Sequence, residues 1–319
     1  MCVWTSTNSG SVRPEVDDSL HVTYTISTNQ VLLFSSEARE TQWCHKLRGR
    51  GSELVDMCGI AGYSLSPDSA VERTLAAQAL LAGIAERGAD AAGYAFRSPG
   101  GRIHVHKQRS GASRLLDQVE IAPDATEVLL HVRDYTKGHP TIEGNNHPIR
   151  HGPVVGVHNG IIFNDEELLD AYGFERAHAD MTVDSEAIFA LAEHADGHAG
   201  ALEELRGSMA TAWLDDRRDG VLFCARGTGR PLWIGEGDGV AFFASTEHAL
   251  EVAESYARVS LAKRELGEGM LVGLEHGRVA WSERFTPNDA FDESPLPPVR
   301  APQERHSCLR LLAALATAA

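Results

Sequence analysis

The 319-residue sequence contains no apolar run long enough to cross a membrane. A spanning helix needs about 18 or more consecutive apolar residues, and the N-terminal region offers only Val31-Leu32-Leu33-Phe34. That stretch is also shorter than the apolar core of a signal peptide. We therefore expect a cytoplasmic protein with no membrane partner.

Cysteine is scarce, with five residues at scattered positions and no Cys-x-x-Cys pair. This spacing argues against a disulfide framework and against a cysteine zinc site, although it leaves room for a single reactive thiol. His104 with His106, and His147 with His151, are explained more simply by a strand and a polar loop than by a metal site, because no third ligand is evident. We predict no metal and no cofactor.

Basic residues are too few to form a broad cationic surface. Lys and Arg number 29 against 45 Asp and Glu, which gives a formal net charge of -16. Such a chain has little means of neutralising phosphates, so nucleic acid is an unexpected partner and a small-molecule substrate is favoured. With 43% hydrophobic and 23% charged residues, the sequence is typical of a globular protein that can bury a full core.

The composition divides the chain into three regions. Residues 1–57 are rich in Ser, Thr and Asn and show little periodicity, so we expect a poorly structured extension. Residues 58–290 alternate short β-type runs with helical patterns and are expected to form the domain. Residues 291–319 begin with several prolines and predict a linker and a frayed tail, with a short apolar helix at 308–319 as the less favoured alternative.

The hydrophobic pattern of the domain predicts many strands with helices grouped between them. We expect strands at Ile60–Leu65, Gly93–Arg97, Arg102–Gln108, Glu127–Arg133, Val154–His158, Met209–Leu214, Val221–Ala225, Val240–Ala244, Met270–Leu274 and Val279–Trp281. Helical patterns cover a segment with Val71, Leu75, Ala79 and Ala82 on one face, capped by Ser66 or Asp68, and Asp165–Tyr172, Ser185–His194, His198–Leu205 and Glu247–Ser255. This arrangement favours stacked antiparallel sheets flanked by helices over a parallel βαβ fold.

Several short motifs combine residues that can carry chemistry. The first is Met57-Cys58-Gly59-Ile60-Ala61-Gly62-Tyr63, in which a cysteine opens the domain. Alone it is weak, because a cysteine entering an apolar strand is more often a buried hydrophobe. The motifs that follow are Arg87-Gly88-Ala89-Asp90-Ala91-Ala92-Gly93, His131-Val132-Arg133, Thr136-Lys137-Gly138-His139-Pro140, Asn145-Asn146-His147-Pro148, His158-Asn159-Gly160-Ile161-Ile162, Thr182-Val183-Asp184-Ser185-Glu186, Ala244-Ser245 and Gly267-Glu268-Gly269.

In this order the motifs resemble the class II glutamine amidotransferase domain, and most closely the glutaminase domain of glucosamine-phosphate synthase. The resemblance covers roughly Cys58 to Asp289. It implies the α+β fold of N-terminal nucleophile hydrolases, a four-layer αββα sandwich of two antiparallel sheets flanked by helices. The implied activity is glutaminase: hydrolysis of the glutamine side-chain amide to glutamate and ammonia.

The residue types suit this chemistry. A free thiol has a pKa of about 8.5 and a free α-amine one of about 7.7 to 8, so an N-terminal cysteine supplies both nucleophile and base. The resemblance implies that Cys58 attacks the amide through a thioester while its own α-amine moves the proton. The Asn159 side chain and the Gly160 backbone N–H would bind the oxyanion. The substrate's α-carboxylate would be bound by Arg133 with Thr136, and its α-ammonium by Asp184.

Each of these residues also has a structural interpretation. Arg133 after an apolar strand is commonly a solvated surface charge, and Asn159-Gly160 between two apolar runs is a strong hairpin-turn signal. Asp184 before a helical pattern is typical of an N-cap. Arg87-Gly88 could simply end the preceding helix.

Two residues of the polar loop from Asp134 to His151 depart from the glucosamine-phosphate synthase pattern. Asp134 and Lys137 replace a tryptophan and a histidine in the segment that closes over glutamine in that family. After Asp289 we find no room for a sugar-isomerase or phosphoribosyltransferase domain. We therefore expect a stand-alone glutaminase that supplies ammonia to a separate synthase subunit. The alternatives are a hydrolase of another γ-glutamyl amide, or a non-catalytic regulatory module of the same fold.

The α-amine of Cys58 can act as a base only once it is released from Met57. The favoured expectation is that translation starts at Met57, which is then removed, so that residues 1–56 are a misassigned upstream extension. A cleaved propeptide is the second expectation, and a permanently blocked, inactive domain is the third.

Overall fold

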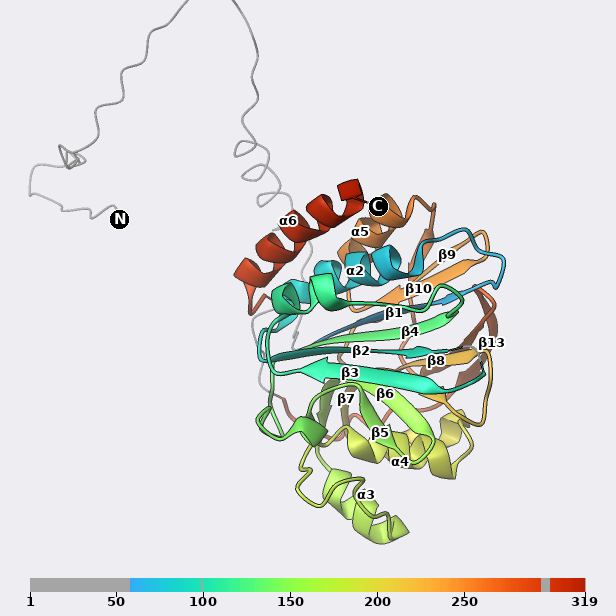
Figure 1. The fold of residues 1–319 in the computed structure, drawn as a ribbon. Helices are drawn as coiled ribbons and strands as arrows, with labels where there is room; N and C mark the ends of the chain where they lie inside the picture. Colours follow the sequence, from blue (N-terminus) through green and yellow to red (C-terminus); the bar gives the residue numbers. More distant parts are fainter. Residues whose placement is uncertain (1–57, 99, 294–298, 319) are drawn as a thin grey trace, which may run out of the picture. The chain divides into compact units, whose positions relative to one another are not determined.

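The computed structural model describes residues 58–98, 100–293 and 299–318, and these contain two antiparallel sheets (Figure 1). The first sheet has the strand order β11-β9-β10-β1-β4-β2-β3. Its strands are β1 (Gly59–Leu65), β2 (Ala91–Arg97), β3 (Ile103–Gln108), β4 (Glu127–Arg133), β9 (Trp233–Gly237), β10 (Val240–Ala244) and β11 (Ala262–Glu265). The second has the order β13-β12-β8-β7-β6-β5. Its strands are β5 (Ile149–His151), β6 (Val154–Ile162), β7 (Gly207–Asp215), β8 (Val221–Arg226), β12 (Met270–Glu275) and β13 (Arg278–Arg284).

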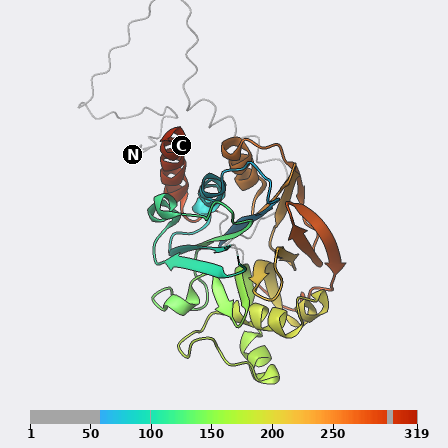
Figure 2. The same ribbon diagram turned by 45° about the vertical axis from the view of Figure 1, so that its right-hand side comes forward.

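Helices cover the outer face of each sheet (Figures 1 and 2). The first sheet is covered by α2 (Arg73–Ile84), α5 (Glu247–Ala257) and α6 (Pro302–Ala318). The second is covered by α4 (Glu186–His194), and α3 (Asp165–Tyr172) packs against α4. The short 3-10 turns are η2 (Ala85–Arg87), η3 (Ala112–Arg114), η4 (Leu116–Gln118), η5 (Glu143–Asn145) and η6 (Ala199–Glu204). The predicted four-layer αββα sandwich is confirmed.

Three apolar layers hold these elements together. One lies between the first sheet and its helices, one between the two sheets, and one between the second sheet and its helices. Strands β1 and β4 are buried along their whole length, because they lie at the centre of a sheet that is covered on both faces. The sequence runs that specify them are consequently almost continuously apolar, and β1 is the strand that follows Cys58.

Most of the predicted elements are present, several with the predicted bounds. The strands β4 and β10 and the helix α3 begin and end where the pattern placed them. The predicted helix His198–Leu205 is instead the 3-10 turn η6. The cap of α2 is Glu72, whose carboxylate accepts from the first-turn N–H groups, and neither Ser66 nor Asp68 serves as the cap. The short or polar strands β5, β9 and β11 were not predicted, since they have little hydrophobic period of their own.

The hairpin-turn interpretation of Asn159-Gly160 is wrong. Strand β6 continues through both residues to Ile162, with Asn159 opposite Ala210 and Gly160 opposite Met209 on β7. Gly160 adopts a φ of 142°, which favours glycine, and a Cβ there would overlap the carbonyl oxygen of Ser208. Pairing with β7, which is distant in sequence, therefore overrides a turn signal that is strong locally.

The C-terminal region also differs from the prediction. Instead of a frayed tail, residues 302–318 form α6, which packs on α2 and buries Cys308 and Leu312 completely. Pro302 at its first position suits a helix start, because that N–H needs no helical partner. The expected extension at 1–57 and the prolines of 294–298 lie outside the described residues. Of the helices in the described part of the chain, none has the length and hydropathy of a membrane span.

Candidate active site

Cys58 lies at the start of β1, the central strand of the first sheet, and is 8% exposed. Its thiol donates to the carbonyl oxygen of Asp134 at 3.3 Å. Burial raises the pKa of this thiol, and the nearby charge of Arg133 offsets the effect only in part. A thiol held in this state needs a base before it can act as a nucleophile.

Five of the six predicted site residues line one small, open pocket. They come from separate parts of the sequence: Cys58, Arg133, Thr136, Gly160 and Asp184. The pocket lies where the ends of β1, β4 and β6 meet, so sheet pairing brings these residues together. Within the described residues we find no group of three or more side chains that could hold a metal ion.

Arg133 is 2% exposed, so the interpretation as a solvated surface charge is wrong. Its guanidinium donates to the side-chain oxygen of Asn146 at 2.7 Å and to the carbonyl oxygens of Lys137, at 2.8 Å, and Gly138. These acceptors are all neutral, and among the described residues no carboxylate forms an ion pair with Arg133. Burial lowers the pKa of Arg133, but an arginine stays protonated, so a rigid positive charge faces the pocket.

Asn159 is the sixth candidate, and it lies fully buried beside the pocket-lining Gly160. Neither its side-chain oxygen nor its nitrogen has a hydrogen-bond partner within the described residues. A buried amide without partners costs about 1 to 3 kcal/mol, so such a group calls for an explanation. A ligand atom that accepts a hydrogen bond from this amide would provide one.

Asp184 faces the pocket and does not cap α4. The N-cap position belongs to Ser185, whereas one Asp184 oxygen accepts from the backbone N–H of Ile162 at 2.7 Å. Burial, with the neighbouring charge of Asp165, raises the pKa of Asp184 to about 6. The N-cap interpretation is therefore wrong. The Asp184 carboxylate is instead hydrogen-bonded to Ile162, the last residue of β6.

The segment that follows Arg133 is fixed by ion pairs at the two positions that depart from the synthase pattern. Asp134 pairs with Arg300 at 2.8 Å, and Lys137 pairs with Asp165 at 2.7 Å. Burial alone would lower the pKa of Lys137, but the hydrogen bonds and charge of Asp165 outweigh it and raise the pKa. Thr136 is exposed between these two anchors.

Three buried histidines around the site were not predicted as functional residues. His147 and His158 line the pocket, and His131 stacks on His147 with ring centroids 4.2 Å apart. Burial lowers the pKa of His131 and of His158 to about 3 and that of His147 well below its usual value, so all three are neutral near pH 7. Each belongs to a motif that we identified in the sequence, but periodicity cannot tell a buried polar side chain from an apolar one.

Two further contacts hold the Cys58 end of β1. The guanidinium of Arg87 donates to the carbonyl oxygen of Cys58 at 2.8 Å, and the Ser245 hydroxyl accepts from Ile60 N–H at 2.9 Å. The helical stretch ends at Arg87, as expected. A Cβ at Gly88 would overlap the backbone of Arg133, so glycine here permits the close approach that forms the pocket wall.

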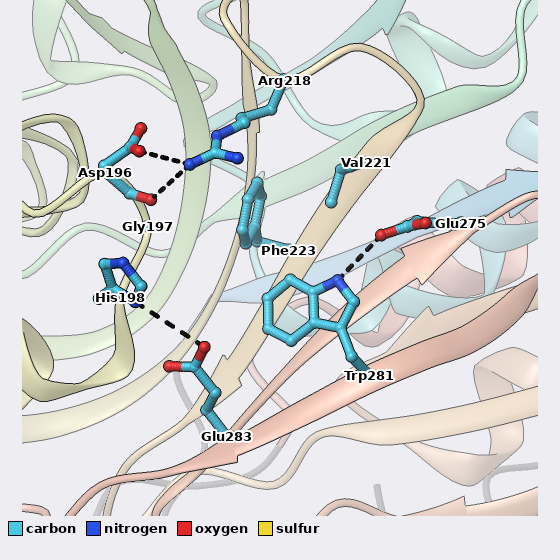
Figure 3. Close-up of a pocket in the computed structure, with 9 residues that line it drawn as sticks. All are labelled: Asp196, Gly197, His198, Arg218, Val221, Phe223, Glu275, Trp281 and Glu283. Carbon is cyan, nitrogen blue, oxygen red and sulfur yellow. Dashed lines mark hydrogen bonds and ion pairs between the residues drawn. The ribbon is translucent and has the colours of Figure 1, made fainter.

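A second hollow lies elsewhere, between η6 and strands β8, β12 and β13, and contains none of the predicted residues (Figure 3). Its wall is the ring of Trp281, which donates to Glu275 at 2.9 Å. At its rim Arg218 pairs with Asp196, and His198 faces Glu283. Because these polar groups already have partners within the hollow, we assign it no function.

Comparison with known proteins agrees with the geometry of the site. Residues 133–252 match the family model of a glutamine amidotransferase domain. The chain is 35% identical over 208 residues to glutamine–fructose-6-phosphate aminotransferase (isomerizing) of Pseudomonas putida, and 34% identical over 210 residues to the Escherichia coli K12 enzyme of that name. Each alignment covers 61% of this chain and 32% of the relative, so the chain spans about a third of their length. Residues 133–252 therefore belong to a glutamine amidotransferase domain, which is similar to those of the class II enzymes.

Solved structures share the fold of this amidotransferase domain. Glutamine phosphoribosylpyrophosphate amidotransferase from B. subtilis superimposes with a TM-score of 0.55 at 21% identity, covering 71% of this chain and 49% of that one. The allosteric regulatory enzyme of purine biosynthesis gives a TM-score of 0.56 at 19% identity, with the same coverage. The family resemblance of the sequence motifs is thus confirmed, and so is the sandwich architecture.

Proposed function

We propose that the amidotransferase domain is a glutaminase in which Cys58 cuts the side-chain amide of glutamine. The observation that carries this proposal is the convergence on one pocket of a buried thiol, a buried arginine and a buried carboxylate, beside an unpartnered amide. These are the groups that amide hydrolysis of an amino acid requires.

The amino-acid end of glutamine would be bound by the two buried charges. Arg133 offers a guanidinium that neutral acceptors hold in place, so it can form charge-assisted hydrogen bonds to the α-carboxylate, next to Thr136. Asp184 would accept from the α-ammonium. The positive charge of that ligand would also stabilise the ionised form of a carboxylate whose pKa burial has raised.

In the proposed reaction, Cys58 Sγ attacks the side-chain carbonyl carbon of glutamine, and the thiol proton passes to the α-amine of Cys58. The resulting oxyanion would be held by the Asn159 amide and the Gly160 N–H, donors worth about 3 to 4 kcal/mol each in comparable sites. The α-ammonium of Cys58 then protonates the nitrogen of the glutamine side-chain amide, the C–N bond breaks, and ammonia departs. Water cleaves the remaining thioester to glutamate and restores the thiol.

This chemistry requires that Cys58 be the first residue of the active species, because a nitrogen bonded to Met57 cannot act as a base. We propose that removal of Met57 after translation from that residue, or cleavage of a propeptide, frees the amine. The raised pKa of the Cys58 thiol supports the need for such a base.

We further propose that the domain acts as a stand-alone glutaminase that delivers its ammonia to a separate synthase subunit. Among the described residues, four large hydrophobic side chains are exposed: Val105, Tyr135, Phe163 and Val299. Tyr135 lines the pocket, and Phe163 follows Ile162, the hydrogen-bond partner of Asp184. Exposed aromatic residues beside a site are typical of a surface that meets another protein.

A second candidate is a hydrolase of another γ-glutamyl amide. It is favoured by Asp134 and Lys137, which depart from the synthase pattern and are both held in ion pairs. In such an enzyme the glutamate end would bind as proposed, while a substituted amide would be the leaving group.

The test is glutamate release from glutamine by the chain begun at Met57, with the N-terminal mass measured on the same sample. We expect activity in a species that starts at Cys58, no activity in Cys58→Ala, and normal activity in Cys224→Ala, a fully buried thiol on β8. Glutamate release by Cys58→Ala would contradict the role of Cys58 as the nucleophile, and an active sample that retains Met57 would contradict the release of the amine. Turnover of γ-glutamyl-p-nitroanilide in preference to glutamine would favour the second candidate.

A further inference from the structure

The start of the C-terminal segment touches both walls that enclose Cys58. The Arg300 side chain pairs with Asp134, with Nε 2.8 Å from Oδ2. The backbone N–H groups of Arg300 and Ala301 donate to the carbonyl oxygen of Glu86 at 3.0 and 2.9 Å. The segment thus contacts the loop after β4 on one side and the turn after α2 on the other.

Both contacts lie next to direct partners of Cys58. Asp134 itself provides the carbonyl oxygen that accepts from the Cys58 thiol at 3.3 Å. Glu86 precedes Arg87, whose guanidinium donates to the Cys58 carbonyl at 2.8 Å. One residue, Asp134, therefore lies between the segment and the nucleophile on one side, and two residues, Glu86 and Arg87, lie between them on the other.

Helix α6 fixes the position of the segment that carries Arg300. The buried Cys308 and Leu312 anchor the helix on the first sheet's helical layer. The Glu304 carboxylate accepts from the N–H and the hydroxyl of Ser113, at 2.9 and 3.1 Å. Asp134 is only 17% exposed, so the pair with Arg300 is partly shielded from water and restrains the loop more than a fully exposed pair would.

We propose that Arg300 is a positioning residue of the active site, which holds the loop from Asp134 to Lys137 over Cys58 and the substrate pocket. Its catalytic consequence rests on the proposed glutaminase function. Asp134 is one of the two departures from the synthase pattern, so the arrangement is a feature of this chain. The loop carries the Cys58 acceptor and the pocket-lining Thr136, and a misplaced loop would weaken glutamine binding.

The chain offers a closely matched control. Arg305 belongs to the same segment, pairs with Glu86 at 2.9 Å and is 39% exposed, against 38% for Arg300, but it has no contact with the loop. In the chain that starts at Cys58, we expect Arg300→Ala to raise the KM for glutamine about two- to five-fold, the range of a partly exposed ion pair, with little change in kcat. Arg305→Ala should leave both values within experimental error. Arg300→Lys should recover part of the loss.

Asp134→Asn tests the pair from its other end and leaves α6 intact. We expect it to raise KM like Arg300→Ala, and the double variant to be no worse than either single one, because both remove the same contact. Additive effects would overturn the assignment, as would equal KM values for Arg300→Ala and Arg305→Ala.

Hydrogen exchange gives a readout that does not depend on activity. The Tyr135 N–H donates to Asp90 at 2.9 Å, so its exchange rate reports whether the loop is held. By mass spectrometry we expect faster exchange at 134–138 in Arg300→Ala than in Arg305→Ala. Equal exchange would overturn the proposal. An inactive wild-type chain with a free Cys58, but with the expected difference in exchange, would instead contradict the glutaminase function.

Discussion

Asp184 accepts a hydrogen bond from the backbone N–H of Ile162 at 2.7 Å, two residues beyond Gly160. This hydrogen bond holds Asp184, the residue proposed to bind the substrate's α-ammonium, against β6. The same strand carries Asn159 and Gly160, the candidate oxyanion donors. The α-ammonium and the side-chain amide of a bound glutamine would therefore both be bound by groups that β6 holds in place. The carboxylate is 3% exposed, and this burial raises the pKa of Asp184 to about 6.

Asp184→Asn should abolish glutamate release and stabilise the free protein. The pKa of Asp184 is raised in the fold from 3.8 to about 6, so its ionisation costs stability as pH rises through that window, and the full cost is present at pH 7. We expect the variant to be about 1 to 3 kcal/mol more stable than wild type by urea denaturation at pH 7. The difference should vanish near pH 4, and the exposed control Asp180→Asn should show none. A destabilised variant at pH 7 would contradict the account.

The same carboxylate predicts an acid limb in the pH profile. Because Asp184 binds the substrate ammonium only when ionised, log kcat/KM for glutamine should fall more steeply with decreasing pH below about 6 than above it, where only protonation of the Cys58 α-amine, with a pKa of about 7.7 to 8, lowers activity. Steady-state assays between pH 4.5 and 8 would measure this limb. A log kcat/KM profile whose slope does not steepen between pH 6 and 5 would show that Asp184 does not contribute to binding.

Asn159→Ala should lower kcat about 10²- to 10³-fold, as expected for one oxyanion donor, with a much smaller effect on KM. The matched control is Asn145→Ala. Asn145 is also fully buried, but its side chain accepts from Thr182 and Val183 N–H at 2.8 and 3.1 Å. We expect that control to lose about 1 to 3 kcal/mol of stability, and Asn159→Ala to lose less, because the Asn159 amide has no partner to leave unpaired. Kinetic assays and thermal melts of both variants would decide.

Arg133→Lys should raise the KM for glutamine about 10- to 100-fold, because an ammonium cannot reproduce the bidentate geometry of the guanidinium. The control is Arg150→Lys, a half-exposed residue that pairs with Asp216 outside the site pocket. Isothermal titration of glutamine into the Cys58→Ala background would measure binding without turnover. Equal affinities with and without the Arg133→Lys substitution would remove Arg133 from the binding site.

The buried histidines predict acid destabilisation. The pKa values of His131 and His158 fall from 6.5 to about 3 in the fold, and that of His147 falls well below 6.5. The unfolded chain therefore takes up protons before the folded chain as pH drops from 6.5 towards 3, and the histidines lower the free energy of unfolding through that window. Between about pH 6 and 4, protonation of Asp184 raises the free energy of unfolding and partly offsets this loss. Each histidine contributes up to about 1.4 kcal/mol per pH unit. Urea denaturation at several pH values should show that the free energy of unfolding falls less steeply with decreasing pH in His147→Leu than in wild type. An unchanged pH dependence would contradict this assignment.

The candidate residues could be predicted from the sequence because the family resemblance rests on short local motifs and their order. Cys58 at the start of an apolar strand, Arg133 at the end of another, and Asp184 before a helical pattern can each be read from neighbouring residues. Strand β4 and helix α3 were predicted with their observed bounds, because a continuous apolar run and a 3.6-residue period identify them.

The structural interpretation of the same residues could not be decided in this way. Asn159-Gly160 has the sequence of a turn, yet its pairing with β7 makes it part of a strand. Asp184 has the position of a cap, yet its carboxylate bonds to Ile162. In both cases the deciding partner is far along the chain.

The sequence by itself determined the order of the motifs, the type of most elements and the chemistry available to the domain. Only the tertiary structure decided that the candidate groups share one pocket, that three neutral histidines surround it, and that Arg300 reaches the loop beside Cys58. The physical reason is that periodicity and residue type record local preferences, whereas burial, the pKa shifts that burial causes and long-range ion pairs exist only once distant segments pack together.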